Sequence, residues 1–263
     1  MVLGGLFIKE KEIPADMVAN IEKVSEGQKI SFGQTVKAVL KNKYTWILLI
    51  MYTAFYLFSG LGSFGVYNFM YVFQDFEMKT FGFVGTINTA LQVVGIFLAP
   101  FLIKLMGRKR IQIVGMIVAG VASIASFFVG YNMTAVIAFG FVKSFGISFI
   151  VASIYVYIAD LTDDVMRRNN GLQASETVSM CSSVGTKVGT GLGSAMVGWL
   201  LAAANVDFAS AAQSESTINS ILFSTHVLPV IFLVITIIMI VIFKPGKTAV
   251  KAADAQEGQT ETV

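Results

Sequence analysis

Six long apolar runs dominate this chain, and five short polar interruptions separate them. The interruptions are QDFEMKT (74–80), GRKR (107–110), YNM (131–133), DLTDDVMRRNN (160–170) and DFASAAQSESTIN (207–219). A helix that crosses a bilayer needs about 20 mostly apolar residues, and each run is long enough. We therefore predict membrane-spanning helices over six ranges: 44–73, 81–104, 111–130, 134–159, 172–203 and 218–243.

The composition indicates that most of the chain lies in lipid. Apolar residues make up 55% of it and charged residues 13%, and the mean hydropathy is +0.73. The 22 Phe and 12 Met residues occur along the whole chain, so the apolar bias is not one anchor on a soluble body. We predict an all-α membrane protein with a six-helix bundle at 44–243, an N-terminal segment at 1–43 and a disordered cytoplasmic tail at 244–263.

The lysines and arginines predict the orientation. If there are six spans, alternate loops share one side of the membrane, and that side holds every Lys and Arg except Lys79, Lys143 and Lys187. Cytoplasmic loops carry the excess of positive charge. We therefore expect a multi-pass protein of the cell's inner membrane with both termini in the cytoplasm.

Lys187 lies within VGTKVGTGLG (184–193), in the middle of the fifth predicted span. Either end of that span is more than about 20 Å away along the helix, and a lysine at such a depth costs at least about 2.5–3.5 kcal/mol. Ser183 and Thr190 share its helix face, and Glu176 lies three turns earlier on it. We call these four residues the polar face and expect it to line a substrate or ion pathway. The alternative is that Lys187 pairs with a buried carboxylate for purely architectural reasons.

Glycines mark two further features. Gly185, Gly189 and Gly193 recur every four residues beside the polar face, and we call them the glycine face. Such small residues let a neighbouring helix approach closely. The first span is about 45 Å long if it is fully helical, against a hydrocarbon core of about 30 Å. Its central glycines, 60, 62 and 65, indicate either a broken helix or a tilted, closely packed one, and Asn68 follows as a possible polar residue of the pathway.

Other polar residues of the spans leave two interpretations open. Lys143, about ten residues into its span, either faces a polar pathway or reaches the membrane interface. His226, the only histidine, either relays protons or makes a packing hydrogen bond.

An acidic cluster with two arginines lies at the inner end of the fourth span. Asp160, Asp163 and Asp164 are spaced i, i+3 and i+4 and are followed by Arg167 and Arg168. We expect Asp160, Asp163 and Arg168 to form ion pairs that gate the cytoplasmic side. The alternative is an ordinary solvated helix end.

Several classes of function are excluded by missing motifs. The chain has no GxxxxGK[ST] phosphate loop and no HExxH, CxxC or GxSxG motif. We therefore predict neither an enzyme nor a metal site, and we expect no cofactor and no nucleic-acid partner.

The segment ADLTDD (159–164), followed by Lys187-Val188-Gly189 and its glycines, resembles a known family. It is similar to A-D-x-x-D-Y … K-x-G-x-x-x-G in the glycoside-pentoside-hexuronide:cation symporters, the melibiose-carrier type of the major facilitator superfamily. Further likenesses are KNKYTWILLI at the first span, GRKR after the second and NVDFASAAQSESTINSI before the last. Asp164 stands where the family has Tyr, and Glu176 is displaced by one place from the family's Glu.

The resemblance covers about residues 35–245 and implies the C-terminal half of a twelve-helix carrier. It implies that residues 1–43 are the end of helix six and the middle cytoplasmic loop. Lys187 would be the family's lysine of helix eleven, with Ser183 and Thr190 as further substrate-binding residues. The coupling cation, Na⁺ or H⁺, would be bound mainly by the acidic residues of an N-terminal six-helix half.

The sequence therefore predicts half of a sugar or glycoside:cation symporter that works by alternating access in the lipid bilayer. The alternative is an inert fragment or an accessory subunit without transport of its own. The sequence does not decide between sugars, between coupling cations or between oligomeric states.

Overall fold

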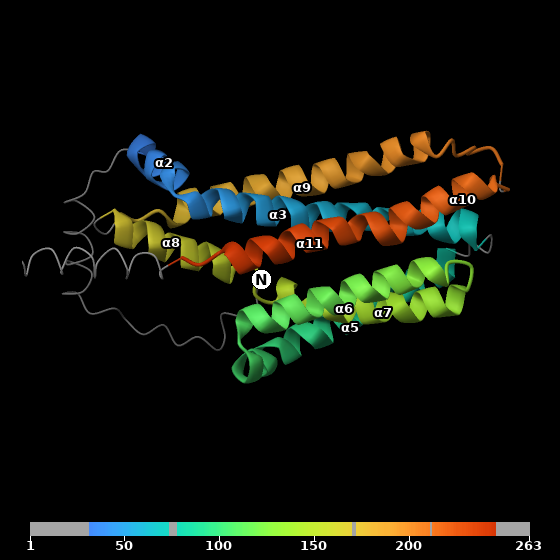
Figure 1. The fold of residues 1–263 in the computed structure, drawn as a ribbon, viewed down its shortest axis with the longest axis horizontal. Coiled ribbons are helices and arrows are strands. Elements are labelled where there is room, and N and C mark those ends of the chain that lie inside the picture. The colour runs from blue at the N-terminus through green and yellow to red at the C-terminus, as the bar shows by residue number, and fades with distance from the viewer. Residues whose placement is uncertain (1–31, 74–77, 170–171, 211, 246–263) are drawn as a thin grey trace, which may run out of the picture.

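The computed structural model describes residues 32–73, 78–169, 172–210 and 212–245, and the regular structure in these ranges is helical (Figure 1). The elements are α2 (Phe32–Lys41), α3 (Lys43–Leu61), η1 (Gly62–Phe64), α4 (Gly65–Tyr67), η2 (Asn68–Val72), α5 (Met78–Met106), α6 (Arg108–Phe128), α7 (Met133–Val151), α8 (Val156–Arg168), α9 (Ser175–Ala203), α10 (Glu215–Leu222), η3 (Phe223–Val227) and α11 (Leu228–Ile242). The prediction of a preceding helix end, within 1–31, and most of the predicted tail lie outside the described residues.

Five stretches of the described chain are long and apolar enough to cross a membrane. They are Lys43–Val72, Lys79–Met106, Arg108–Phe128, Met133–Arg168 and Glu215–Ile242. Each corresponds to one of the predicted spans, which confirms those five. The remaining predicted span, α9, is a helix of 29 residues but is not among these five stretches. Its glycines, its serines and threonines, Glu176 and Lys187 lower its hydropathy.

The helices form two groups of three that lie against each other. In one group α9 packs along one side of α3 while α11 packs along another side of it, and in the other group α7 packs against both α5 and α6 (Figure 1). Contacts of α11 with α6 join the groups. The largest cluster of buried side chains draws on both groups and includes Leu48, Met116, Ile150 and Leu233.

The glycine face forms the contact between α9 and α3, as its spacing predicts. A Cβ atom added at Gly189 would lie 2.5 Å from the carbonyl oxygen of Thr53, and one at Gly193 would lie 2.7 Å from that of Leu57. A Cβ atom at Gly185 would lie 2.9 Å from the Cβ of Tyr52. The two backbones are therefore so close that α3 leaves no room for a methyl group on this face of α9.

The first span is one continuous helical run whose winding changes in its second half, and its glycines have two different roles. The helix tightens into the 3₁₀ turn η1 and then widens into the π-helical turn η2. Gly60 packs against α9, since its Cβ would lie 2.8 Å from the Thr190 carbonyl oxygen. Gly62 and Gly65 have open space where a Cβ would stand. Close packing therefore holds for Gly60, while Gly62 and Gly65 lie where the winding of the helix changes without a break.

Three segments predicted as loops are helical. Only Gly107, with φ of 85°, interrupts the chain between α5 and α6, so the three basic residues of GRKR form the first turn of α6. DLTDDVMRRNN continues as α8 to Arg168, because Leu161 and Val165 are buried on one side of this helix, while the charged residues other than the buried Asp164 are partly or fully exposed. Within the N-terminal segment 1–43, residues 32–41 form α2.

Candidate functional site

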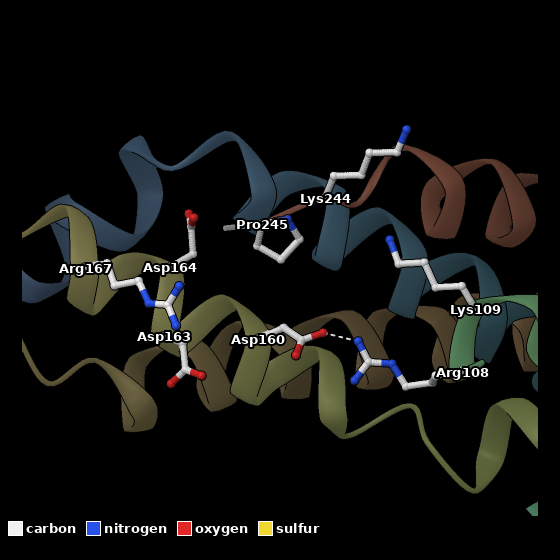
Figure 2. A pocket seen from close by; sticks show the side chains of 8 residues that line it. All are labelled: Arg108, Lys109, Asp160, Asp163, Asp164, Arg167, Lys244 and Pro245. Atoms are coloured by element: carbon white, nitrogen blue, oxygen red, sulfur yellow. Dashed lines mark hydrogen bonds and ion pairs between the residues drawn. The ribbon is translucent and has the colours of Figure 1, made fainter. Parts of the chain in front are cut away.

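Four helix ends meet in a charged cluster at one end of the bundle. The guanidinium of Arg108, at the start of α6, donates to the carboxylate of Asp160 on α8 (Figure 2). Lys109 donates to the carbonyl oxygens of Ile240, at 3.2 Å, and Phe243, at the end of α11. These contacts satisfy carbonyl groups that the end of a helix leaves free. We call this cluster, with Asn42, Asp164 and Arg168, the basic end.

Asp164 is the buried member of the basic end. Its carboxylate accepts from Arg168 Nε at 2.7 Å and from Asn42 Nδ2 at 2.8 Å, while its side chain is 1% exposed. The same Asn42 caps α3, because its Oδ1 accepts from the Tyr44 backbone N–H. Arg168 also lies 6.0 Å from the Tyr44 ring centroid. A single carboxylate thus connects α8 to the start of α3.

The three predicted gating residues do not form ion pairs with one another, although we expected them to. Asp160 pairs with Arg108, Arg168 pairs with Asp164, and the side chain of Asp163 is exposed. All three aspartates border a pocket of about 420 Å³ that also has Arg108, Lys109, Arg167 and Lys244 in its wall (Figure 2). Sequence spacing shows only which residues are neighbours on one helix, and the predicted group included neither Asp164, the partner of Arg168, nor Arg108, the partner of Asp160.

A series of hydrogen-bonded polar side chains lies next to the Arg108–Asp160 pair, and the sequence analysis did not predict it. The Tyr157 hydroxyl donates to Gln112 Oε1, and Gln112 Nε2 donates to the Ser153 hydroxyl. The Arg108 guanidinium lies 5.0 Å from the Tyr157 ring centroid. The polar Gln112 inside the apolar run of the third span was the available signal. This chain of contacts connects the charged pair to the core between α6 and the junction of α7 with α8.

We expect the Arg108–Asp160 pair to stabilise the contact between α6 and α8. A double-mutant cycle with Arg108→Gln and Asp160→Asn should give a coupling of about 1 kcal/mol, since both side chains are only partly exposed. Thermal unfolding of the purified chain in detergent measures it. Asp163→Asn is the matched control and should change stability by less than about 0.5 kcal/mol. Additive effects of the two substitutions would contradict the coupling.

The polar face of α9 is uncovered. Glu176, Ser183, Lys187 and Thr190 are all exposed, while the glycine face behind them is buried against α3. Ser183 donates to the Ser179 carbonyl at 2.9 Å, and no carboxylate of the described residues forms an ion pair with Lys187. Within the described part of the chain, Lys187 thus lacks the carboxylate partner that the architectural interpretation requires.

Lys143 borders a second cavity, of about 390 Å³, between the two helix groups. The polar residues of its wall are Tyr56, Ser59, Gln92, Lys143, Ser144 and Thr225. Ser144 also donates to Asn88 Oδ1 at 2.7 Å, which ties α7 to α5. Gly62 and Gly65 form part of the wall, so the part of the first span where the winding changes adjoins this space.

Asn68 and His226 are paired in the core, where two π-helical turns come together. Asn68 Nδ2 lies 3.1 Å from His226 Nε2, and the Ser123 hydroxyl donates to the His226 carbonyl at 2.8 Å. Both side chains are buried, and neither borders the cavities described above. The contacts match the packing interpretation of His226.

Comparison with known proteins identifies the family. The model of the family described as MFS/sugar transport protein matches residues 6–246. The chain belongs to this family. It is therefore a multi-pass membrane protein of a transporter family and not an enzyme, as the sequence analysis predicted. In the part of the chain that the structure describes, no group of three His, Cys, Asp or Glu side chains is arranged to hold a metal ion.

Three curated relatives with similar sequences show how much of a full-length carrier this chain spans. It is 25% identical over 238 residues to the "Isoprimeverose transporter" of Lactiplantibacillus pentosus, covering 89% of this chain and 48% of that protein. It is 24% identical to the "Putative 2,3-dihydroxypropane-1-sulfonate exporter" of Salmonella typhimurium, covering 83% of this chain and 47% of that protein. It is 23% identical to the "Putative sulfoquinovose importer" of Escherichia coli, covering 76% of this chain and 42% of that protein. The chain spans about half the length of the curated relatives it matches.

Proposed function

We propose that this chain is the C-terminal half of a secondary active transporter that couples uptake of a sugar or glycoside to Na⁺ or H⁺ by alternating access. In this proposal α9 is also a membrane span, the fifth in chain order, and completes a six-helix bundle at residues 44–243. An N-terminal six-helix half packs against it in the inner membrane. Both termini of the chain are cytoplasmic, and the basic end faces the cytoplasm.

The uncovered polar face of α9 is the observation that supports the proposal most. A helix of 29 residues buries its glycine face and leaves the Lys187 ammonium exposed near its middle. Exposure to lipid is costly for an ammonium group at this depth, whereas a hydrated pathway between two bundles accommodates it. The relatives named as transporters of isoprimeverose and sulfoquinovose favour a sugar as the substrate.

In the proposed cycle, Lys187 hydrogen-bonds the substrate or a carboxylate across the interface, and Ser183 and Thr190 add neutral donors. Glu176 and Lys143 border the same polar path. The two bundles rock about this site. The Arg108–Asp160 and Arg168–Asp164 pairs of the basic end stabilise one state and open in the other.

The test is sugar uptake by cells that make this chain together with a matching N-terminal half. We expect Lys187→Ala to lower cation-dependent uptake at least about tenfold, because an interaction made at the transport site is lost. Lys79→Ala, at the exposed start of α5, is the matched control and should leave uptake unchanged.

Wild-type uptake by Lys187→Ala would remove the lysine from the mechanism. If no cation-dependent uptake of any sugar occurs with a matching half present, the alternative of an inert or accessory chain is favoured instead.

A further inference from the structure

A third pocket lies at the end of the bundle opposite the basic end, and we call it the terminal pocket. It lies between the ends of α6 and α9 and the first turns of the last span, α10 and η3, whereas α8 and the basic end lie at the other end (Figure 1). Its volume is about 720 Å³, within the range of roughly 300–1,000 Å³ that is common for ligand sites. It shares no wall residue with the cavity beside Lys143 or with the pocket of the basic end, so it is a separate site.

The terminal pocket lies at the depth where lipid headgroups meet acyl chains. Phe127 is next to the last residue of the span Arg108–Phe128, and Glu215 is the first residue of the span Glu215–Ile242. Trp199 and Tyr131 are exposed at the same end of the bundle, and residues of these two types gather at membrane–water interfaces. The pocket is thus placed to receive both the polar and the apolar part of a lipid.

The terminal pocket lies away from the polar face of α9. Leu200, in its wall, follows Gly193 by seven residues, which is about two turns, so it continues the glycine face. Lys187 and the polar face lie on a different side of the helix. In the function proposed above, the facing bundle covers the polar face. That bundle therefore leaves the terminal pocket to the surrounding lipid.

The polar groups of the terminal pocket come mainly from α10. Glu215 begins this helix, and Ser216, Asn219 and Ser220 follow it in the wall. The Glu215 carboxylate forms no ion pair with another described residue, and no Lys, Arg or His of the described chain borders the pocket. The Ser220 hydroxyl donates to the Ser216 carbonyl at 2.9 Å, which leaves the hydroxyl oxygen free to accept. One negative charge and several acceptors fit a cation that carries hydrogen-bond donors.

Apolar side chains complete the wall beside these acceptors. Phe127 lines the pocket from α6, Leu200 from α9 and Phe223 from η3. Phe223 is also exposed, although it belongs to a membrane span. A ligand that is polar throughout would leave these groups without apolar contacts, whereas a hydrocarbon chain would cover them. The terminal pocket therefore fits an amphipathic ligand whose polar part is cationic.

We propose that the terminal pocket binds one phospholipid whose headgroup carries a primary ammonium, as phosphatidylethanolamine does. The ammonium pairs with Glu215 and donates to Ser220, the phosphate accepts from the Asn219 amide, and an acyl chain packs on Phe127 and Leu200. A choline headgroup has no N–H donors for these acceptors, and a glycerol headgroup leaves the lipid negatively charged beside Glu215. The inference goes beyond transport, because it requires only that the chain lies in a bilayer.

The experiment counts the lipids that the purified full chain retains. The chain is placed in bilayers with equal amounts of phosphatidylethanolamine, phosphatidylcholine and phosphatidylglycerol that carry the same acyl chains. It is then extracted in mild detergent, and native mass spectrometry identifies each bound lipid. Glu215→Gln removes the charge and Glu215→Asp keeps it. Asp207→Asn is the matched control, since it removes an exposed carboxylate at the same end of the bundle that does not border the pocket.

We expect the wild-type chain to retain the ethanolamine lipid about fivefold over the choline lipid, the factor that a partly exposed ion pair can supply. Glu215→Gln should lower this ratio to about one. Glu215→Asp should keep most of the preference and Asp207→Asn all of it. Thermal unfolding of each variant in detergent without phospholipid should stay close to that of the wild type, which separates lost lipid binding from misfolding.

Three outcomes in the isolated chain would overturn the inference: equal retention of the three lipids by the wild type, an unchanged preference in Glu215→Gln, and an equal loss of preference in Asp207→Asn. The count is repeated with a matching N-terminal half bound. Loss of the ethanolamine lipid there would mean that the facing half covers the pocket, which also overturns the inference. Sugar uptake is not measured in any arm, so a failure of the proposed function is distinguishable from a failure of this inference.

Discussion

Replacing Gly189 with alanine should destabilise the chain by at least about 1–3 kcal/mol, the range seen when a packed interface is overfilled. The added methyl group would lie 2.5 Å from the Thr53 carbonyl oxygen and 2.9 Å from the Tyr56 Cβ. Neither atom is the end of a flexible side chain, so α3 and α9 must separate. Thermal unfolding in detergent measures the loss, and a lowered yield of folded protein should accompany it.

Gly191→Ala is the matched control, two residues further along the same helix. Nothing lies within 4 Å of where its Cβ would stand. Alanine has a higher helix propensity than glycine by up to about 1 kcal/mol, so this variant should be as stable as the wild type or more so. The two substitutions thus have opposite expected signs, although their chemistry is identical. Equal effects at both positions would contradict the close packing of α9 on α3.

The glycine face was predictable from the sequence because its cause is local. A repeat of four residues places Gly185, Gly189 and Gly193 on one side of a helix whichever helix packs there. The choice of partner was not predictable. It depends on Gly60, which belongs to a segment more than 120 residues earlier and meets α9 at the Thr190 carbonyl.

Polarity misled the prediction of helix boundaries for one physical reason. In DLTDDVMRRNN the charges were taken as the end of a span, but α8 continues through them to Arg168. Leu161 and Val165 are buried, and so is Asp164, which pairs with Arg168 and Asn42, and these contacts sustain the helix beyond the apolar run. For α9 the predicted helix at 172–203 agrees with the structure, although its polar residues lower its hydropathy.

The ion pairs of the basic end show where sequence spacing stops being informative. Arg168 and Asp164 pair at i, i+4, so a helical pattern identifies such a contact. Asp160 instead pairs with Arg108, which lies 52 residues earlier in the chain. GRKR was interpreted as a determinant of membrane orientation, and that interpretation needs no specific partner. The structure adds contacts from Arg108 and Lys109 that hold α6 to α8 and to the end of α11.

The polar groups of the chain occupy three separate places, and this arrangement is informative about function. The basic end gathers the paired charges, the cavity beside Lys143 has one cation in an aromatic wall, and the polar face of α9 is uncovered. Only the first is internally neutralised within the described residues. The other two have no opposite charge within the described residues, and in the function proposed above the polar face of α9 meets a hydrated path against a facing bundle.

Replacing Asn42 with aspartate should be more damaging than its small change in shape implies. Asp caps helices as well as Asn does, so the contact from Oδ1 to the Tyr44 N–H is retained. The Asn42 Nδ2 group, however, donates to the buried Asp164 carboxylate at 2.8 Å, and the substitution puts a second negative charge there. Loss of a hydrogen bond to a charged group costs about 1.5–3 kcal/mol, and repulsion between the carboxylates adds to this.

The double variant Asn42→Asp with Asp164→Asn tests this explanation directly. It exchanges donor and acceptor, so the amide at 164 again donates to a carboxylate, and Arg168 stays within reach of the negative charge, because it borders the same surface pocket as Asn42. Thermal unfolding of the purified chain should show that this exchange recovers most of the stability lost in Asn42→Asp alone. Asn42→Ser, which keeps a cap without adding charge, should fall between the wild type and Asn42→Asp. A double variant no more stable than Asn42→Asp would mean that the geometry of the cap, and not the charge on Asp164, joins α8 to α3.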